Sequence, residues 1–179
     1  MSDTVNRPLV PDDILSIADS FASALRRRGW SCATAESCTG GGIALEITSI
    51  AGSSDYMQGG IVAYSNDVKL GLLAVSQGTL DSVGAVSEAC AREMARGVRH
   101  ALGTDVGISS TGIAGPGGAT ARKPVGLVYI AVSTPETEAV REIRLNGNRQ
   151  HVMRESARLA LELANSAIGD GAQAPETEQ

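Results

Sequence analysis

The sequence predicts a single α/β domain, a three-layer α/β/α sandwich built on a mixed, mostly parallel sheet. Apolar helical stripes alternate with short apolar runs along the chain, an order typical of strands covered by helices. Hydrophobic residues make up 42% of the 179 residues but aromatic residues only 3%, so we expect a core of Ala, Val, Ile and Leu. Two predicted strands also end in Ser/Thr- and Gly-rich turns, as the ligand-binding edges of such sheets do.

The chain is predicted to begin with a flexible arm, residues 1–10, followed by a helix over residues 11–28. Pro11 and the two acidic residues after it suit the first turn of a helix. The cationic run Arg26-Arg27-Arg28, followed by Gly29, suits its end. An arginine run is also a candidate phosphate site, but we interpret this one as the solvated end of the helix.

The first strand, residues 30–36, leads into a glycine-rich turn that starts the next helix. Ser37 and Cys38 lie in this turn, and either is a candidate nucleophile. The alternative is that Ser37 or Thr39 is only the N-cap of the helix. We expect the strand to bury Glu36, which then hydrogen-bonds the amides of the turn, pairs with a cation, or acts as an acid or base.

The helix after the turn is predicted over residues 43–50, and a second strand over residues 59–64. A short helix over residues 68–73 and a helical piece over residues 79–83 follow. A long helix over residues 87–102 has its apolar positions on one face.

The third strand, residues 105–110, runs into a glycine-rich loop over residues 111–118. The strand over residues 125–134 is nearly all apolar, so we expect it to be central. Residues 139–145 alternate charged and apolar side chains, as a half-exposed edge strand does. The last helix follows the basic residue Arg149.

Charge and composition exclude several classes of protein. The net charge of −5 provides no electrostatic basis for binding nucleic acid or an anionic membrane. No apolar run approaches the roughly 20 residues that span a bilayer, and the start of the chain does not resemble a signal peptide, so we expect the cytoplasm. The three cysteines and two histidines lack the spacing of metal ligands or disulfides, so we expect no metal.

A polar tail, residues 169–179, is predicted to be disordered. With the arm over residues 1–10, this leaves one predicted domain over residues 11–168.

The scarcity of histidine directs the search for a catalytic base to lysine. A serine hydroxyl needs a base to take its proton, and a buried lysine becomes neutral near pH 7. Lys69 follows the second strand among apolar residues, and Tyr64 at the end of that strand is a candidate to relay a proton or orient the lysine. The alternative for Lys69 is a surface lysine. Cys38 is a rival nucleophile because helix N-termini lower thiol pKa values; it ranks below Ser37 because no histidine is placed to pair with it.

The third strand ends in residues suited to an anion. Thr111 and the glycines after it offer a hydroxyl and backbone N–H groups, which suit a phosphate or a carboxylate. Because the ends of the first and third strands meet at one sheet edge, we expect Ser37 and Thr111 to share a pocket. Arg149 is a candidate phosphate clamp. The alternatives are a mobile surface loop and a surface charge.

Several motifs stand in one order along the chain: Thr34-Ala-Glu-Ser-Cys-Thr-Gly-Gly41, Ile50-Ala-Gly-Ser-Ser54, Tyr64-Ser-Asn66 with Lys69, Gly84-Ala-Val-Ser87, and Ser110-Thr-Gly-Ile-Ala-Gly-Pro116 before Lys123-Pro-Val-Gly126. Together they resemble the C-terminal domain of the competence/damage-inducible protein family CinA. The resemblance covers roughly residues 14–163. This family includes nicotinamide mononucleotide deamidases of the PncC type, and its fold is an α/β/α sandwich on a mixed sheet.

The resemblance implies hydrolysis of the carboxamide of nicotinamide mononucleotide to nicotinate mononucleotide and ammonia, with no metal and no cofactor. It implies Ser37 as nucleophile, Lys69 as base and Tyr64 as the supporting tyrosine. Backbone N–H groups of residues 38–40 are expected to hold the oxyanion. The expected contacts to the nucleotide substrate are Cys38, Thr39, Gly40, Thr111, Gly112, Gly115 and Arg149. The family also implies a homo-oligomer. The alternative is a non-catalytic nucleotide-binding or regulatory module of the same type.

Overall fold

The computed structural model describes residues 10–169, so the predicted arm and tail lie almost entirely outside the described residues. Val10, the last residue of the predicted arm, is buried. The helices are α1 (Asp12–Arg28), α2 (Gly42–Thr48), α3 (Asn66–Leu73), α4 (Gln77–Ser82), α5 (Glu88–Ala101) and α6 (Arg149–Gly169), with a short 3-10 helix η1 (Ser53–Asp55). The strands are β1 (Cys32–Glu36), β2 (Met57–Val62), β3 (Val106–Gly112), β4 (Leu127–Ser133) and β5 (Glu138–Arg144).

The five strands form one sheet in the order β2-β1-β3-β4-β5. β1 is parallel to both β2 and β3, whereas β4 is antiparallel to both β3 and β5. Four strands therefore run in one direction and only β4 runs in the other, which confirms the mixed, mostly parallel sheet. The strand in the middle is β3; β4 lies inside the sheet next to the edge strand β5.

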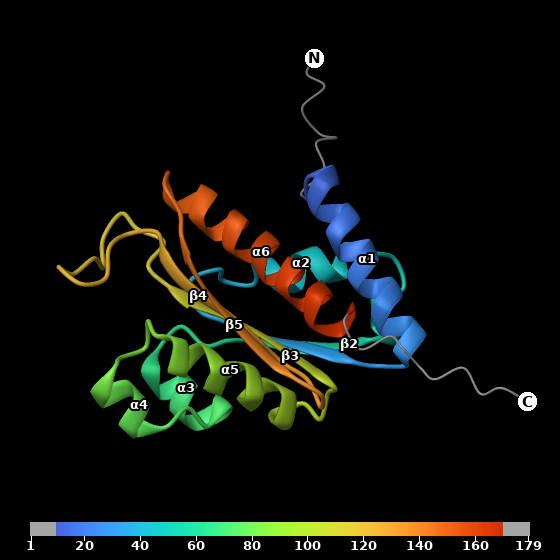
Figure 1. Ribbon diagram of the computed structural model, residues 1–179, viewed down its shortest axis with the longest axis horizontal. Helices are drawn as coiled ribbons and strands as arrows, with labels where there is room; N and C mark the ends of the chain where they lie inside the picture. The colour runs from blue at the N-terminus through green and yellow to red at the C-terminus, as the bar shows by residue number, and fades with distance from the viewer. Residues whose placement is uncertain (1–9, 170–179) are drawn as a thin grey trace, which may run out of the picture.

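Helices cover both faces of this sheet, as the three-layer prediction requires. Figure 1 shows α1, α2 and α6 on one face and α3, α4 and α5 on the other. The first face packs around Phe21, Leu25, Ile43, Ile108 and Leu161, all of which are buried. The second face has a smaller core that includes Leu73, Met94 and Val98. Each fully buried side chain of this size contributes about 1.5–3 kcal/mol.

Glycine lets two helices approach very closely on the second face. A Cβ built on Gly97 of α5 would lie 1.9 Å from the carbonyl oxygen of Leu73, at the end of α3. Only a residue without a side chain fits there, so Gly97 determines how closely α3 packs on α5. This contact positions the helix that carries Lys69.

The arginines at the end of α1 are not merely solvated. The guanidinium of Arg26 lies 5.0 Å from the ring centre of Tyr56 and donates to the carbonyl of Ala51 at 3.1 Å. Arg28 stacks on Trp30 and pairs with Glu136. The interpretation of this run as a solvated helix end is therefore incomplete, because two of its cations tie distant loops to α1.

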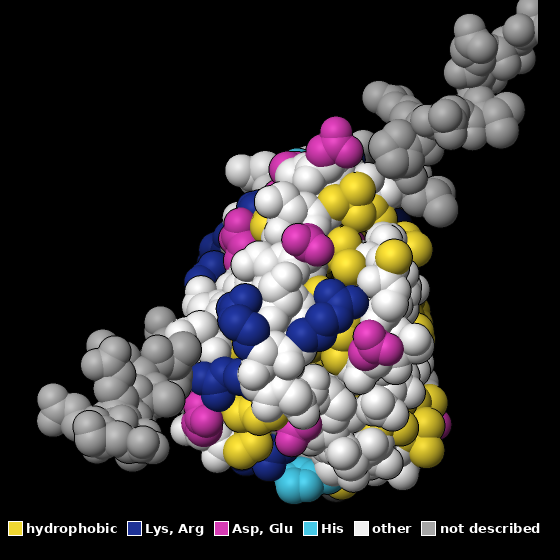
Figure 2. Space-filling view, turned by 90° about the vertical axis from the view of Figure 1, so that its right-hand side faces the viewer, with side chains coloured by type: hydrophobic (Ala, Val, Ile, Leu, Met, Phe, Trp, Pro, Cys, Tyr) yellow, Lys and Arg dark blue, Asp and Glu magenta, His cyan; other side chains and the backbone are white. Residues whose placement is uncertain are grey.

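Charges of both signs are interspersed on the face of the molecule drawn in Figure 2. Lys and Arg side chains lie close to Asp and Glu side chains there, so this face presents no extended basic surface. Among residues 10–169, no helix combines the length and apolarity that crossing a bilayer requires.

Candidate active site

Ser37 lies directly after β1, at the carboxyl edge of the sheet. Its backbone N–H donates to the carbonyl of Ser110 on β3 at 3.0 Å, so the turn continues the β1–β3 pairing by one more bond. Gly40 and Gly41 then take φ values of 64° and 103°, which only glycine adopts without strain. The chain can therefore reverse sharply between the strand and α2.

Glu36 holds this turn together from inside the protein. The residue is 1% exposed, and its carboxylate accepts N–H groups from Gly41 at 3.0 Å, Ile43 at 3.1 Å and Ala44 at 2.9 Å. The hydroxyl of Thr39 donates to it at 2.6 Å. Of the roles left open for Glu36, the structure therefore selects hydrogen bonding to the amides of the turn. A buried carboxylate with several such donors stabilises a helix N-terminus.

The interpretation of Ser37 or Thr39 as the N-cap of α2 is wrong. The N-cap position is Gly41, which has no side chain to cap the helix. Because the Glu36 carboxylate already satisfies the first amides of the helix, the Ser37 hydroxyl is not needed for capping.

Lys69 is buried, so the alternative of a surface lysine is also wrong. Its residue is 1% exposed, and the Nζ atom lies 2.7 Å from the carbonyl oxygen of Ala63 and 3.4 Å from that of Tyr64. The same atom lies 3.3 Å from Oγ of Ser37. Burial lowers the pKa of Lys69 below its ordinary value, and no carboxylate pairs with it among residues 10–169.

The Tyr64 hydroxyl forms no hydrogen bond with Ser37 or Lys69 in the described part of the chain. The side chain is well exposed, and its hydroxyl accepts a hydrogen bond from Nη2 of Arg149 at 3.1 Å. The Tyr64 atom that hydrogen-bonds to Lys69 is its main-chain carbonyl oxygen. The expectation that this hydroxyl relays the proton of the lysine is therefore wrong for this arrangement, and the tyrosine instead helps to orient the arginine.

A cavity of about 280 Å³ contains most of the predicted site residues. Its lining includes the predicted residues Ser37, Cys38, Tyr64, Lys69, Thr111, Gly112, Gly115 and Arg149. The same lining includes Asn66, Ala85 and Val86, which sequence reasoning left without a role although they lie within or beside the quoted motifs. The predicted meeting of the β1 and β3 ends in one pocket is confirmed.

Thr111 is buried, and its hydroxyl donates to the carbonyl of Ala85 at 2.7 Å. This bond ties the loop before α5 to the end of β3. Arg149, at the start of α6, donates from Nη1 to the carbonyl of Gly115 at 2.9 Å. The residues that line the cavity include no Asp or Glu, and Arg149 makes no ion pair within the described part of the chain. The cavity therefore suits an anionic ligand.

Two predicted substrate contacts fall elsewhere. Thr39 and Gly40 do not line this cavity; they line a separate one on the other side of the turn. The Thr39 hydroxyl is 2.6 Å from both Glu36 and Ser110, so it serves the turn itself. The chain reverses at Gly40 and Gly41, and Thr39 and Gly40 face the cavity on the side of the turn away from Ser37. The hydrophobic periodicity of the sequence does not reveal this direction.

The thiol of Cys38 is a poor rival nucleophile. The residue is 5% exposed, and burial raises the pKa of its thiol to about 12. The expectation that the helix start lowers this pKa is wrong, because desolvation by burial outweighs the hydrogen bonds and the nearby Lys69 that lower it. The thiol stays protonated at neutral pH.

Comparisons with known proteins indicate the family of this chain. Residues 14–168 match the family model described as the CinA C-terminal domain. A CinA-like protein from Gloeobacter violaceus is 48% identical over 156 residues, which cover 86% of this chain and 36% of that protein. A CinA-like protein from Rippkaea orientalis is 52% identical over 118 residues, which cover 66% of this chain and 28% of that protein. The chain thus spans about a third of the length of the curated relatives it matches.

Solved structures show the same fold. The competence/damage inducible protein CihA from Agrobacterium tumefaciens has a TM-score of 0.87 and 39% identity, covering 91% of this chain and 99% of that one. A competence-damaged protein (CinA) superfamily protein from Klebsiella pneumoniae has a TM-score of 0.84 and 32% identity, covering 88% of this chain and 98% of that one. Sequence and structure agree, and this chain belongs to the CinA C-terminal domain family.

Proposed function

We propose that this protein is an amidohydrolase that cleaves the carboxamide of nicotinamide mononucleotide, giving nicotinate mononucleotide and ammonia. The observation that supports this most is the buried amine of Lys69, 3.3 Å from the Ser37 hydroxyl. A lysine is almost never buried without a carboxylate partner unless its chemistry requires it.

As an ammonium, Lys69 donates to three oxygens: the Ser37 hydroxyl and the carbonyls of Ala63 and Tyr64. In its neutral form the amine has two N–H donors and one lone pair, and the two carbonyls accept from the two donors. The lone pair then faces the Ser37 hydroxyl and accepts its proton. Burial favours this neutral form because it lowers the pKa of the lysine.

In the proposed reaction, Ser37 attacks the carboxamide carbon while Lys69 takes its proton. We assign the oxyanion to the N–H of Cys38, because residues 39 and 40 border the other cavity. One such donor typically contributes about 3–4 kcal/mol. The C–N bond then breaks, and ammonia leaves with the proton held by Lys69. Water cleaves the acyl-enzyme by the same route, with Lys69 again taking and returning a proton.

The nucleotide phosphate is proposed to contact Arg149 and the glycines that follow β3. Three observations support this: the cavity lining has no acidic residue, Arg149 has no ion pair there, and Tyr64 and Gly115 hold its guanidinium in place. A planar guanidinium suits bidentate contact with phosphate.

Cytoplasmic location and self-association remain predictions from the sequence. Size-exclusion chromatography with light scattering tests self-association.

An ammonia-release assay tests the proposal. The wild-type chain should hydrolyse nicotinamide mononucleotide, and Ser37→Ala and Lys69→Ala should each lose activity while keeping the wild-type circular dichroism spectrum. Cys38→Ala should remain active; loss of activity in that variant alone would assign the nucleophile to the thiol. Nucleotide binding without turnover by the wild type would favour the non-catalytic module instead. Nicotinamide riboside and free nicotinamide, which lack the phosphate, should be poorer substrates.

A further inference from the structure

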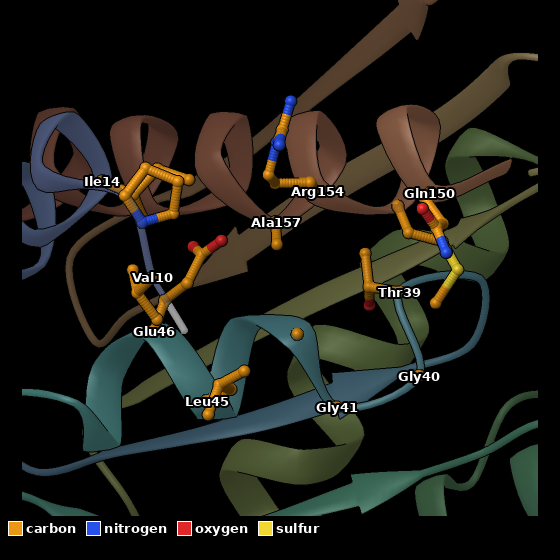
Figure 3. A pocket seen from close by; sticks show the side chains of 13 residues that line it. Val10, Ile14, Thr39, Gly40, Gly41, Leu45, Glu46, Gln150, Arg154 and Ala157 are labelled. Carbon is orange, nitrogen blue, oxygen red and sulfur yellow. The ribbon is translucent and has the colours of Figure 1, made fainter. Parts of the chain in front are cut away.

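A second cavity, of about 410 Å³, lies between the start of α1, α2 and α6 (Figure 3). Its walls are largely apolar, and they include Val10, Ile14, Leu45, Met153 and Ala157. Its lining shares no residue with that of the candidate active site, although both border the turn after β1. Its volume suits a small organic molecule with a compact apolar body.

One carboxyl group lies in this apolar cavity without a partner. Glu46 of α2 is 4% exposed, and Figure 3 shows its carboxyl directed between Ile14 and Ala157. Its Oε2 atom is buried and has no hydrogen-bond partner among the described residues. Buried polar atoms in native proteins are nearly always hydrogen-bonded, so this one points to a missing partner.

The charges around Glu46 do not neutralise it. Asp13 of α1, Glu36 of β1 and Glu155 of α6 add negative potential, and only Arg158 of α6 opposes them. Arg158 forms its ion pairs with Glu155 and with a glutamate one turn further along α6. Arg154, on the rim of the cavity, also lies near Glu155, at 3.8 Å. Burial and these acids raise the pKa of Glu46 to about 8.

We propose that this cavity is a second binding site, which takes a small organic amine whose ammonium group donates to Glu46 while its apolar part fills the pocket. A bare metal cation is a poorer candidate, because divalent cations need several oxygen ligands and this site offers one carboxyl among apolar walls. A protonated amine satisfies the carboxylate with its N–H groups and removes apolar surface from water.

Calorimetric titration of the full chain tests this site, with benzylamine as the probe and benzyl alcohol as its uncharged match. At pH 8 benzylamine should bind at least tenfold more tightly than benzyl alcohol. Glu46→Gln keeps the shape of the side chain but not its charge, and it should weaken benzylamine binding at least tenfold. Glu88→Gln, which removes a carboxylate from α5 on the other face of the sheet, should change nothing, and neither should Ser37→Ala.

The pH dependence of wild-type binding provides an independent measurement, even if Glu46→Gln fails to fold. Because the carboxyl must lose its proton before it pairs with the ammonium, affinity should rise about tenfold from pH 6 to pH 7 and level off above about pH 8. Equal affinity for benzylamine and benzyl alcohol, a pH-independent affinity, or loss of binding in Ser37→Ala would each overturn the site. None of these outcomes depends on whether the chain hydrolyses nicotinamide mononucleotide.

Discussion

Replacing Lys69 by methionine separates the catalytic proposal from a structural role for this side chain. Methionine fills a similar volume but has no amine, so nothing takes the proton of Ser37. General base catalysis typically contributes about 10²–10⁴-fold, and we expect a loss of turnover in that range. Lys123→Met removes the only other lysine of the chain, which lies outside the cavity lining, and should keep most of the activity.

The same substitution should change how stability depends on pH. Burial lowers the pKa of Lys69 below the 10.5 of an ordinary lysine, so the unfolded chain binds this proton more tightly than the folded chain does. Between the lowered pKa and 10.5, the stability of the wild type therefore rises with pH. The slope from this one group is at most about 1.4 kcal/mol per pH unit. The Lys69→Met variant has no amine at this position, so its unfolding free energy should lack the rise with pH that Lys69 contributes.

Urea denaturation of both proteins at several pH values measures the effect. The unfolding free energy of the wild type, minus that of Lys69→Met, should increase as the pH rises toward about 10. The acid limb of kcat/KM for the wild type should report the same lowered pKa. If the stability difference were flat across this range, Lys69 would titrate as a solvated lysine, and the reasoning from burial would be refuted.

Three further predictions follow from individual contacts. Gly97→Ala should destabilise the fold by about 1–3 kcal/mol because its Cβ meets the Leu73 carbonyl, whereas Gly71→Ala on open α3 surface should be neutral or stabilising; thermal unfolding compares the two. Cys38 should react slowly with iodoacetamide at pH 7.5, because the pKa of its thiol is about 12; fast modification accompanied by inactivation would contradict this. Arg149→Gln should raise KM for the nucleotide at least tenfold while changing that for free nicotinamide little, and an equal change for both would argue against a phosphate contact.

Most of the secondary structure could be predicted because its signals are local. The cationic run and Gly29 end α1, and Gly29 has a φ of 63° that suits this position. Ser65 begins α3 and Ser87 begins α5, each accepting an N–H three residues later. The loop predicted from residue 111 instead starts later, because β3 continues to Gly112 through its pairing with β4. A strand end depends on its neighbour in the sheet, which the local pattern does not contain.

The sequence by itself determined the layered fold and the meeting of two strand ends at one pocket, because apolar periodicity and turn residues act over a few neighbouring positions. Only the tertiary structure decided that Lys69 is buried against Ser37, that the Tyr64 hydroxyl faces Arg149, and that Thr39 serves the turn rather than the cavity. Burial and side-chain direction depend on elements distant in the chain, such as α5 packing on α3 at Gly97, so no short stretch of sequence contains them.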